Sequence, residues 1–85
     1  MNRDDVYALV DAERARQQSD KWNREHDDWG YGDCSSPAVD DSTKVMVLTE
    51  ECGEVARAVL ELDVDATRRE LIQVAAVAVA WLEEL

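Results

Sequence analysis

The 85-residue chain is poor in turn-forming residues and in positive charge. It contains 3 Gly, 1 Pro and no Phe, too few turn residues for a β protein made of many short strands. Its only cysteines, Cys34 and Cys52, are too few for a disulfide-stapled secreted domain. There are 9 Lys and Arg against 20 Asp and Glu, a net charge of −11. This charge argues against binding to nucleic acid and to an anionic membrane surface.

Long hydrophobic runs are also missing. The longest apolar-rich run, residues 71–82, is too short to span a bilayer, and the first residues lack the apolar stretch of a signal peptide. We therefore expect a single cytoplasmic domain. A domain of this size buries a modest fraction of its surface, so its stability is expected to depend on a partner subunit.

Helical periodicity is present in three segments. The first covers residues 4–20, the second runs from Asp41 or Ser42 to about residue 62, and the third follows a short turn at residues 63–65. Residues 21–41, rich in Asp, Gly, Ser and Trp, are predicted to form a loop. The fold class is therefore all-α, with an N-terminal helix followed by a helical hairpin over residues 42–85.

The apolar faces of the second and third segments predict how they pack. In the second, one apolar stripe includes Cys52 as a small core residue; its members are Val45, Leu48, Cys52, Val55, Ala56 and Val59. The third segment runs to about Glu84, and the capping-box spacing of Thr67 and Glu70 places its start as late as Thr67. It is apolar almost all round and must be buried on all sides. This predicts an oligomeric helix bundle, a dimer or a tetramer, with this helix at its centre.

Acidic side chains recur at helical spacing on both arms of the hairpin. Glu51 and Glu54 lie three residues apart on the second helix, and Glu70 and Gln73 repeat that spacing on the third. The two pairs are placed symmetrically about Leu62, beside the predicted turn. Residues equidistant from the turn of an antiparallel hairpin lie at the same height, so the pairs are expected to face each other across one groove.

Three carboxylates in one groove repel one another, and a divalent cation offsets that repulsion most simply. All-oxygen ligation by Glu51, Glu54 and Glu70, with the carbonyl oxygen of Gln73, suits Mg²⁺ or Mn²⁺ and not zinc. In a chain with 20 acidic residues, such pairs also arise by chance as solvated helix faces. Spacing alone leaves both interpretations open.

Two stretches of the chain resemble a known family. They are Lys44-Val-Met-Val-Leu-Thr-Glu-Glu-Cys-Gly-Glu-Val-Ala-Arg-Ala and Arg69-Glu-Leu-Ile-Gln-Val-Ala-Ala-Val. They resemble the MazG-like all-α nucleoside triphosphate pyrophosphohydrolases, which carry Glu-Glu-x-x-Glu on one helix and Glu-x-x-Asp on the next. The resemblance covers roughly residues 42–85, half the chain. A weaker one covers residues 13–17 with Lys21 and Trp22.

The resemblance implies magnesium-dependent hydrolysis of a nucleoside or deoxynucleoside triphosphate to the monophosphate and pyrophosphate, as in nucleotide-pool house-cleaning. Glu51, Glu54 and Glu70 match the family's magnesium ligands. Gln73 stands where the family usually has Asp, which removes one negative charge. Glu50 points away from the groove and is either a supporting acid or a surface residue. The alternatives are a catalytically silent relative that binds a nucleotide or a protein, and a purely structural helical dimerisation module.

Other candidates surround this predicted site. Lys44, two turns before Glu51, is either a phosphate contact or a solvated lysine, and Lys21 is a similar candidate. The loop holds Trp22, Trp29 and Tyr31, whose rings either stack on a base or pin the loop to the core. His26, Cys34 and Cys52 do not have the spacing of a zinc site.

Overall fold

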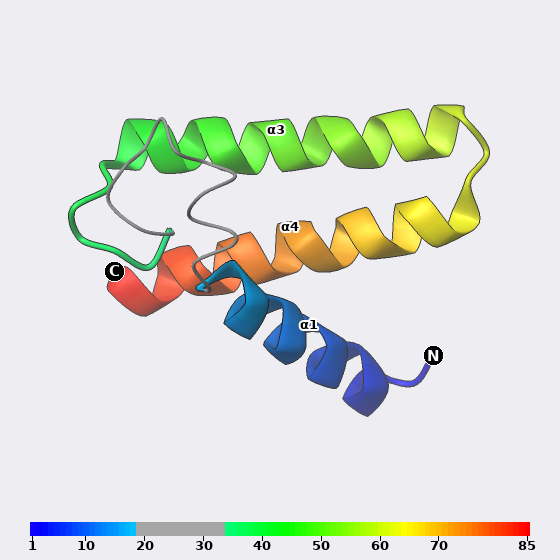
Figure 1. Ribbon diagram of the computed structural model, residues 1–85, viewed down its shortest axis with the longest axis horizontal. Coiled ribbons are helices and arrows are strands. Elements are labelled where there is room, and N and C mark those ends of the chain that lie inside the picture. The colour runs from blue at the N-terminus through cyan, green and yellow to red at the C-terminus, as the bar shows by residue number, and fades with distance from the viewer. Residues whose placement is uncertain (19–33) are drawn as a thin grey trace.

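A computed structural model describes residues 1–18 and 34–85 of the chain. Within these residues it contains three helices and no strand: α1 (Arg3–Gln17), α3 (Asp41–Leu60) and α4 (Val64–Glu84). The helices α3 and α4 form an antiparallel hairpin, and α1 packs obliquely against α4 on the side away from α3 (Figure 1). The all-α class and the hairpin are confirmed. No described helix is both long and apolar enough to cross a membrane.

Each helix begins after an Asn or Asp whose side chain accepts a hydrogen bond from the backbone N–H three residues further on. These capping residues are Asn2, Asp40 and Asp63. The predicted caps Asp41 and Ser42 are therefore wrong by one or two residues. The late start at Thr67 is also wrong, because Asp63 caps α4 and the Thr67 hydroxyl donates to its carbonyl oxygen at 2.8 Å.

The turn between α3 and α4 fixes which residues of the hairpin face each other. The Leu62 N–H donates to the Val59 carbonyl at 3.0 Å, and the Asp63 N–H donates to the Ala58 carbonyl at 3.1 Å. This is the Schellman arrangement that ends many helices. It places Leu62 in the left-handed region, with φ of 56°, a position that favours glycine. The hairpin therefore turns at Leu62, about which the acidic pairs are symmetric. The turn predicted at residues 63–65 is wrong by about two residues, because Asp63 caps α4 and that helix begins at Val64.

The buried core lies toward the end of the hairpin that is distant from the turn. It contains Cys34, Val47, Val77 and Ala80, with Leu48 and Trp81 packed against it. Two ion pairs lie at this end: Lys44 pairs with Glu84 at 2.9 Å, and Arg14 pairs with Glu83. The last turn of α4 is thereby joined to both other helices.

Most of the predicted apolar stripe of α3 is turned away from the core of the chain, although its member Leu48 packs against that core. The hairpin buries instead the face made of Lys44, Val47, Glu51 and Ala58. Cys52 is exposed, so its predicted core role is wrong. The physical reason is that α3 has apolar residues on two sides, and α4 covers only the side that also carries Glu51.

The helix α4 is central but is not covered all round by this chain. It contacts α3 on one side and α1 on another, and Ala76, Val77 and Ala80 are buried. Leu71 and Leu82 remain largely exposed. The prediction of a helix buried on all sides is therefore not met within one chain.

Candidate metal centre

The hairpin brings the two acidic motifs into contact. Gln73, on α4, lies between Glu70 of its own helix and Glu51 of α3. The amide orientation that satisfies its neighbours donates from the Gln73 nitrogen to Glu70 Oε2 at 3.0 Å and to Glu51 Oε2 at 2.7 Å. A single neutral donor thus joins carboxylates from opposite arms of the hairpin.

Glu51 is the most buried acid of the group, with 6% of its surface exposed. Its pKa is raised to about 7, chiefly by burial and also by the nearby carboxylates of Glu70, Glu50, Glu54 and Glu13. Each of these effects disfavours the charged form of the carboxyl. The groove therefore holds more negative charge than the protein itself compensates.

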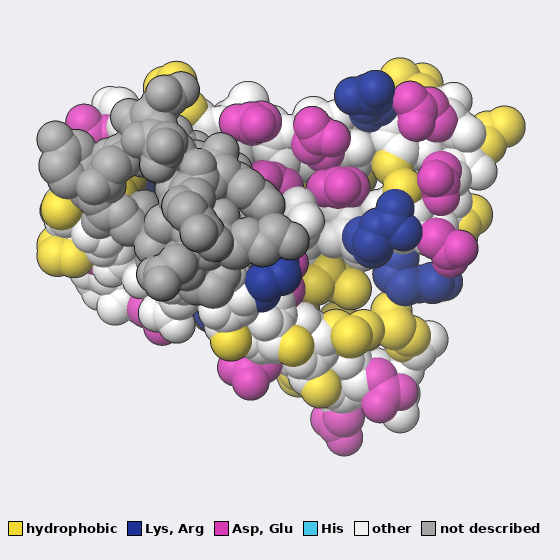
Figure 2. Space-filling view, viewed as in Figure 1, with side chains coloured by type: hydrophobic (Ala, Val, Ile, Leu, Met, Phe, Trp, Pro, Cys, Tyr) yellow, Lys and Arg dark blue, Asp and Glu magenta, His cyan; other side chains and the backbone are white. Residues whose placement is uncertain are grey.

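The pKa of Glu70 is also raised. Burial raises its pKa, and the carboxylate of Glu54 adds to the rise, whereas the Arg69 guanidinium lowers it. Glu54 is exposed at the edge of the groove and Glu50 is exposed on α3. On the face seen in Figure 2, acidic side chains gather over α3 and along its border with α4, and most of the visible basic side chains lie toward the hairpin turn.

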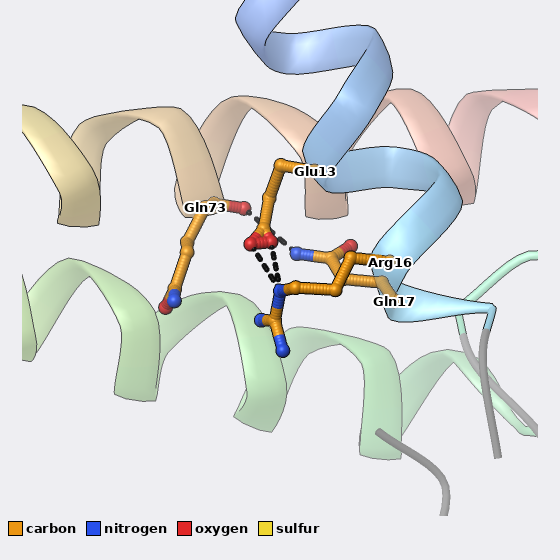
Figure 3. Close-up of polar contacts among 4 residues, drawn as sticks. All are labelled: Glu13, Arg16, Gln17 and Gln73. Atoms are coloured by element: carbon orange, nitrogen blue, oxygen red, sulfur yellow. Dashed lines mark hydrogen bonds and ion pairs between the residues drawn. The ribbon is translucent and has the colours of Figure 1, made fainter. Parts of the chain in front are cut away.

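The helix α1 adds residues that the sequence did not assign to the site. Glu13 and Gln17 lie beside Gln73 in Figure 3. The side-chain amide of Gln17 donates to the backbone carbonyl oxygen of Gln73 at 3.4 Å. Arg16 pairs with Glu13 at 2.6 Å. A usable signal was present, since Val6, Val10, Glu13 and Gln17 follow one another at helical spacing. The first two of these residues are apolar and the last two are polar, which indicates a polar site near the C-terminal end of α1.

The donor set fits Mg²⁺ or Mn²⁺ by its chemistry, because Glu51, Glu54, Glu70 and Gln73 offer only oxygen ligands and an excess of negative charge. Among residues 1–18 and 34–85, no group of three or more Asp, Glu, His or Cys side chains lies close enough together to hold an ion. The nitrogen of Gln73 lies between two of the acids. To hold an ion with these ligands, the Gln73 amide would have to turn its oxygen inward and the carboxylates would have to move closer together.

The remaining predicted site residues are placed differently. Lys44 is completely buried and its ammonium is paired with Glu84, so its interpretation as a solvated lysine is wrong. In this arrangement it is not open to a substrate phosphate either. The predictions for Lys21, Trp22, His26, Trp29 and Tyr31 lie outside the described residues.

Comparison of the chain with protein-family models, with curated proteins and with solved structures found no match. The resemblance noted in the sequence therefore rests on its own motifs alone.

Proposed function

We propose that this protein is a magnesium-dependent pyrophosphohydrolase of nucleoside or deoxynucleoside triphosphates. The observation that carries the proposal is the contact of Gln73 with both Glu70 and Glu51. Residues of the two motifs that resemble the family's are thus in contact across the hairpin. Chance acidic pairs on solvated faces would not leave Glu51 almost completely buried among other carboxylates.

In this proposal the residues of the groove bind the metal and position the helices around it. Glu51 and Glu54 of α3 and Glu70 of α4 bind the metal, and Gln73 contributes its carbonyl oxygen after the amide turns. When bound, Mg²⁺ would neutralise the triphosphate and activate the attacking water. The Gln17 hydrogen bond to the Gln73 backbone positions α1 over the site. The burial of Glu51 limits access of bulk water to this part of the groove.

The protein is further proposed to act as a homo-oligomer. The exposed Leu71 and Leu82 of α4, together with Val45 and Val59 of α3, leave apolar surface on both arms of the hairpin. A second copy of the chain that covers these residues would give the bundle that the composition of α4 requires.

The decisive experiment is a product assay. Purified protein is incubated with a panel of NTPs and dNTPs in Mg²⁺ or Mn²⁺, and the products are separated by ion-exchange chromatography. Monophosphate and pyrophosphate should appear together. The activity should be lost in Glu54→Ala and retained in Asp11→Ala, which removes an exposed acid of α1. Phosphate release without pyrophosphate would contradict the proposed reaction.

One observation favours a second candidate, a catalytically silent relative that binds nucleotide or a protein partner. Gln73 supplies no charge, and its donor nitrogen satisfies Glu51 and Glu70 without a metal. Such a protein would give no product across the panel. A nucleotide-binding form would still show a rise in Tm on addition of a nucleotide, because a ligand of the native state stabilises it by mass action.

A further inference from the structure

A small cavity adjoins the acidic groove on the side of the hairpin turn. It has a volume of about 260 Å³. Its walls carry charged side chains from both arms of the hairpin, and two alanines complete the lining; the lining residues are Glu54, Arg57, Ala58, Glu61, Asp63, Ala66, Arg69 and Glu70. Because Glu54 and Glu70 belong to both the cavity and the proposed metal site, the two sites are adjacent.

Arg69 is the donor that this cavity leaves available. It forms no ion pair with any residue in the described part of the chain, although its charge lowers the pKa of Glu70. Arg57 is instead paired with Glu61 at 3.2 Å, in an exposed contact of the kind that contributes little to stability. A guanidinium presents planar paired donors that match a phosphate group. Arg69 is thus placed to bind an anion that reaches the metal site.

The charge of the cavity restricts that anion. The cavity is open to solvent and, at about 260 Å³, has room for one or two phosphate groups. Four carboxylates face two guanidiniums around it, so a free anion is repelled. A phosphate enters favourably only with a divalent cation that offsets Glu54 and Glu70.

We infer that this cavity is the subsite for the pyrophosphate part of the substrate, with Arg69 as its phosphate-binding residue. The triphosphate then lies with its outer phosphates toward the hairpin turn and its nucleoside toward Glu51 and α1. Pyrophosphate is retained here after cleavage, while the monophosphate occupies the opposite end of the groove. The inference rests on the proposed function, since it assigns a direction to the substrate of that reaction.

Binding of inorganic pyrophosphate, measured by calorimetry with and without MgCl₂, tests the subsite without requiring turnover. The intact protein should bind pyrophosphate only when Mg²⁺ is present. Arg69→Ala should weaken binding at least tenfold, and Arg69→Lys should weaken it less. Arg68→Ala is the matched control, because Arg68 is the adjacent arginine but pairs with Asp65; it should change the affinity less than twofold. Binding of a nucleoside monophosphate should be unaffected by Arg69→Ala.

Two results would overturn the inference: no magnesium-dependent binding of pyrophosphate by the intact protein, or equal affinities for the intact protein and Arg69→Ala. Circular dichroism of each variant identifies any failure to fold, and Arg69→Lys then supplies the comparison. Turnover of triphosphates without an effect of Arg69 would contradict this subsite alone. Binding of pyrophosphate through Arg69 without any turnover would support the subsite and contradict the proposed reaction.

Discussion

Glu51 is held among other carboxylates, and this makes its protonation part of the stability of the fold. Its ordinary pKa of 4.5 is raised to about 7 in the folded protein, chiefly by burial. The folded state therefore binds a proton more tightly than the unfolded state. Between these two values, stability should fall as the pH rises, because ionisation of Glu51 is easier in the unfolded chain. Below pH 4.5 this effect is absent.

Replacement of Glu51 by Gln should remove this pH dependence. The Gln side chain keeps an oxygen that can accept from Gln73 but carries no charge. In EDTA at pH 8, Glu51→Gln should be more stable than the parent by roughly 1–3 kcal/mol; at pH 4.5 the difference should be close to zero. Urea unfolding at a series of pH values measures this, with the exposed Asp11→Asn as control. A constant difference across the range would show that ionisation of Glu51 is not the cause.

In the proposed metal site, residue 73 is expected to set the affinity for Mg²⁺. Asp at this position restores a carboxylate and removes the donor that joins Glu51 to Glu70. Gln73→Asp should therefore lower the metal-free Tm and raise the affinity for Mg²⁺ roughly tenfold, about 1.4 kcal/mol. Calorimetric titration with MgCl₂ measures the affinity.

The control for this change is Gln18→Asp, which introduces the same residue at an exposed position after α1. It should leave the affinity for Mg²⁺ unchanged. Equal affinities for the parent and Gln73→Asp would place residue 73 outside the ligand set. A tighter site in Gln18→Asp as well would attribute the gain to overall charge.

At the scale of the helices, the hairpin turn is the element that aligns the site, and it contains strain. Leu62 adopts a left-handed conformation that costs a residue with a Cβ roughly 1–2 kcal/mol, and the residue is 88% exposed. Leu62→Gly should therefore stabilise the protein by about 0.5–1 kcal/mol, after the larger entropy of Gly in the unfolded chain is deducted.

Thermal or urea unfolding measures the effect of Leu62→Gly, and Leu60→Gly is the matched control. Leu60 is also exposed but is the last residue of α3, where Gly should destabilise by up to about 1 kcal/mol. Destabilisation by both substitutions would indicate that the contacts of the Leu62 side chain matter more than its backbone conformation.

The hairpin could be predicted from the sequence because its signals are local. Periodicity located α3 and α4, and the short turn then fixed that Glu51 faces Gln73. The cap of α3 was misplaced because Asp40, Asp41 and Ser42 are all capable of capping. Burial of Lys44 could not be predicted, since its partner Glu84 lies forty residues away in the chain.

The position of α1 depends likewise on contacts that sequence periodicity does not specify. Gln17 donates to the backbone of Gln73, 56 residues further on, and Arg14 pairs with Glu83. The polar residues at the end of the apolar stripe of α1 do not indicate which helix they contact. Prediction therefore recovered the half of the groove formed by the hairpin and missed the contribution of α1.

At the scale of the whole molecule, α3 leaves apolar residues exposed on the side that borders the face of Glu51. These residues follow one another at helical spacing: Val45, Cys52, Ala56 and Val59. They belong to the stripe that the sequence assigned to the core. Val45 and Val59 expose about half of their surface, and the apolar surface is continuous enough along the helix to pack against a second copy of the chain.

The proposed homo-oligomer should therefore separate when charge is placed on this stripe. The double variant Val45→Lys with Val59→Lys should be monomeric by light scattering at concentrations where the parent is a dimer or larger, because burial of two lysines without partners opposes association. Its helix content by circular dichroism should persist, since neither residue contributes to the buried core. The matched control is Ala8→Lys with Ala12→Lys, which adds two lysines at exposed positions of α1 and should leave the assembly intact. If the parent itself is monomeric, or if the Val45 and Val59 variant still associates, the stripe is not an interface between copies.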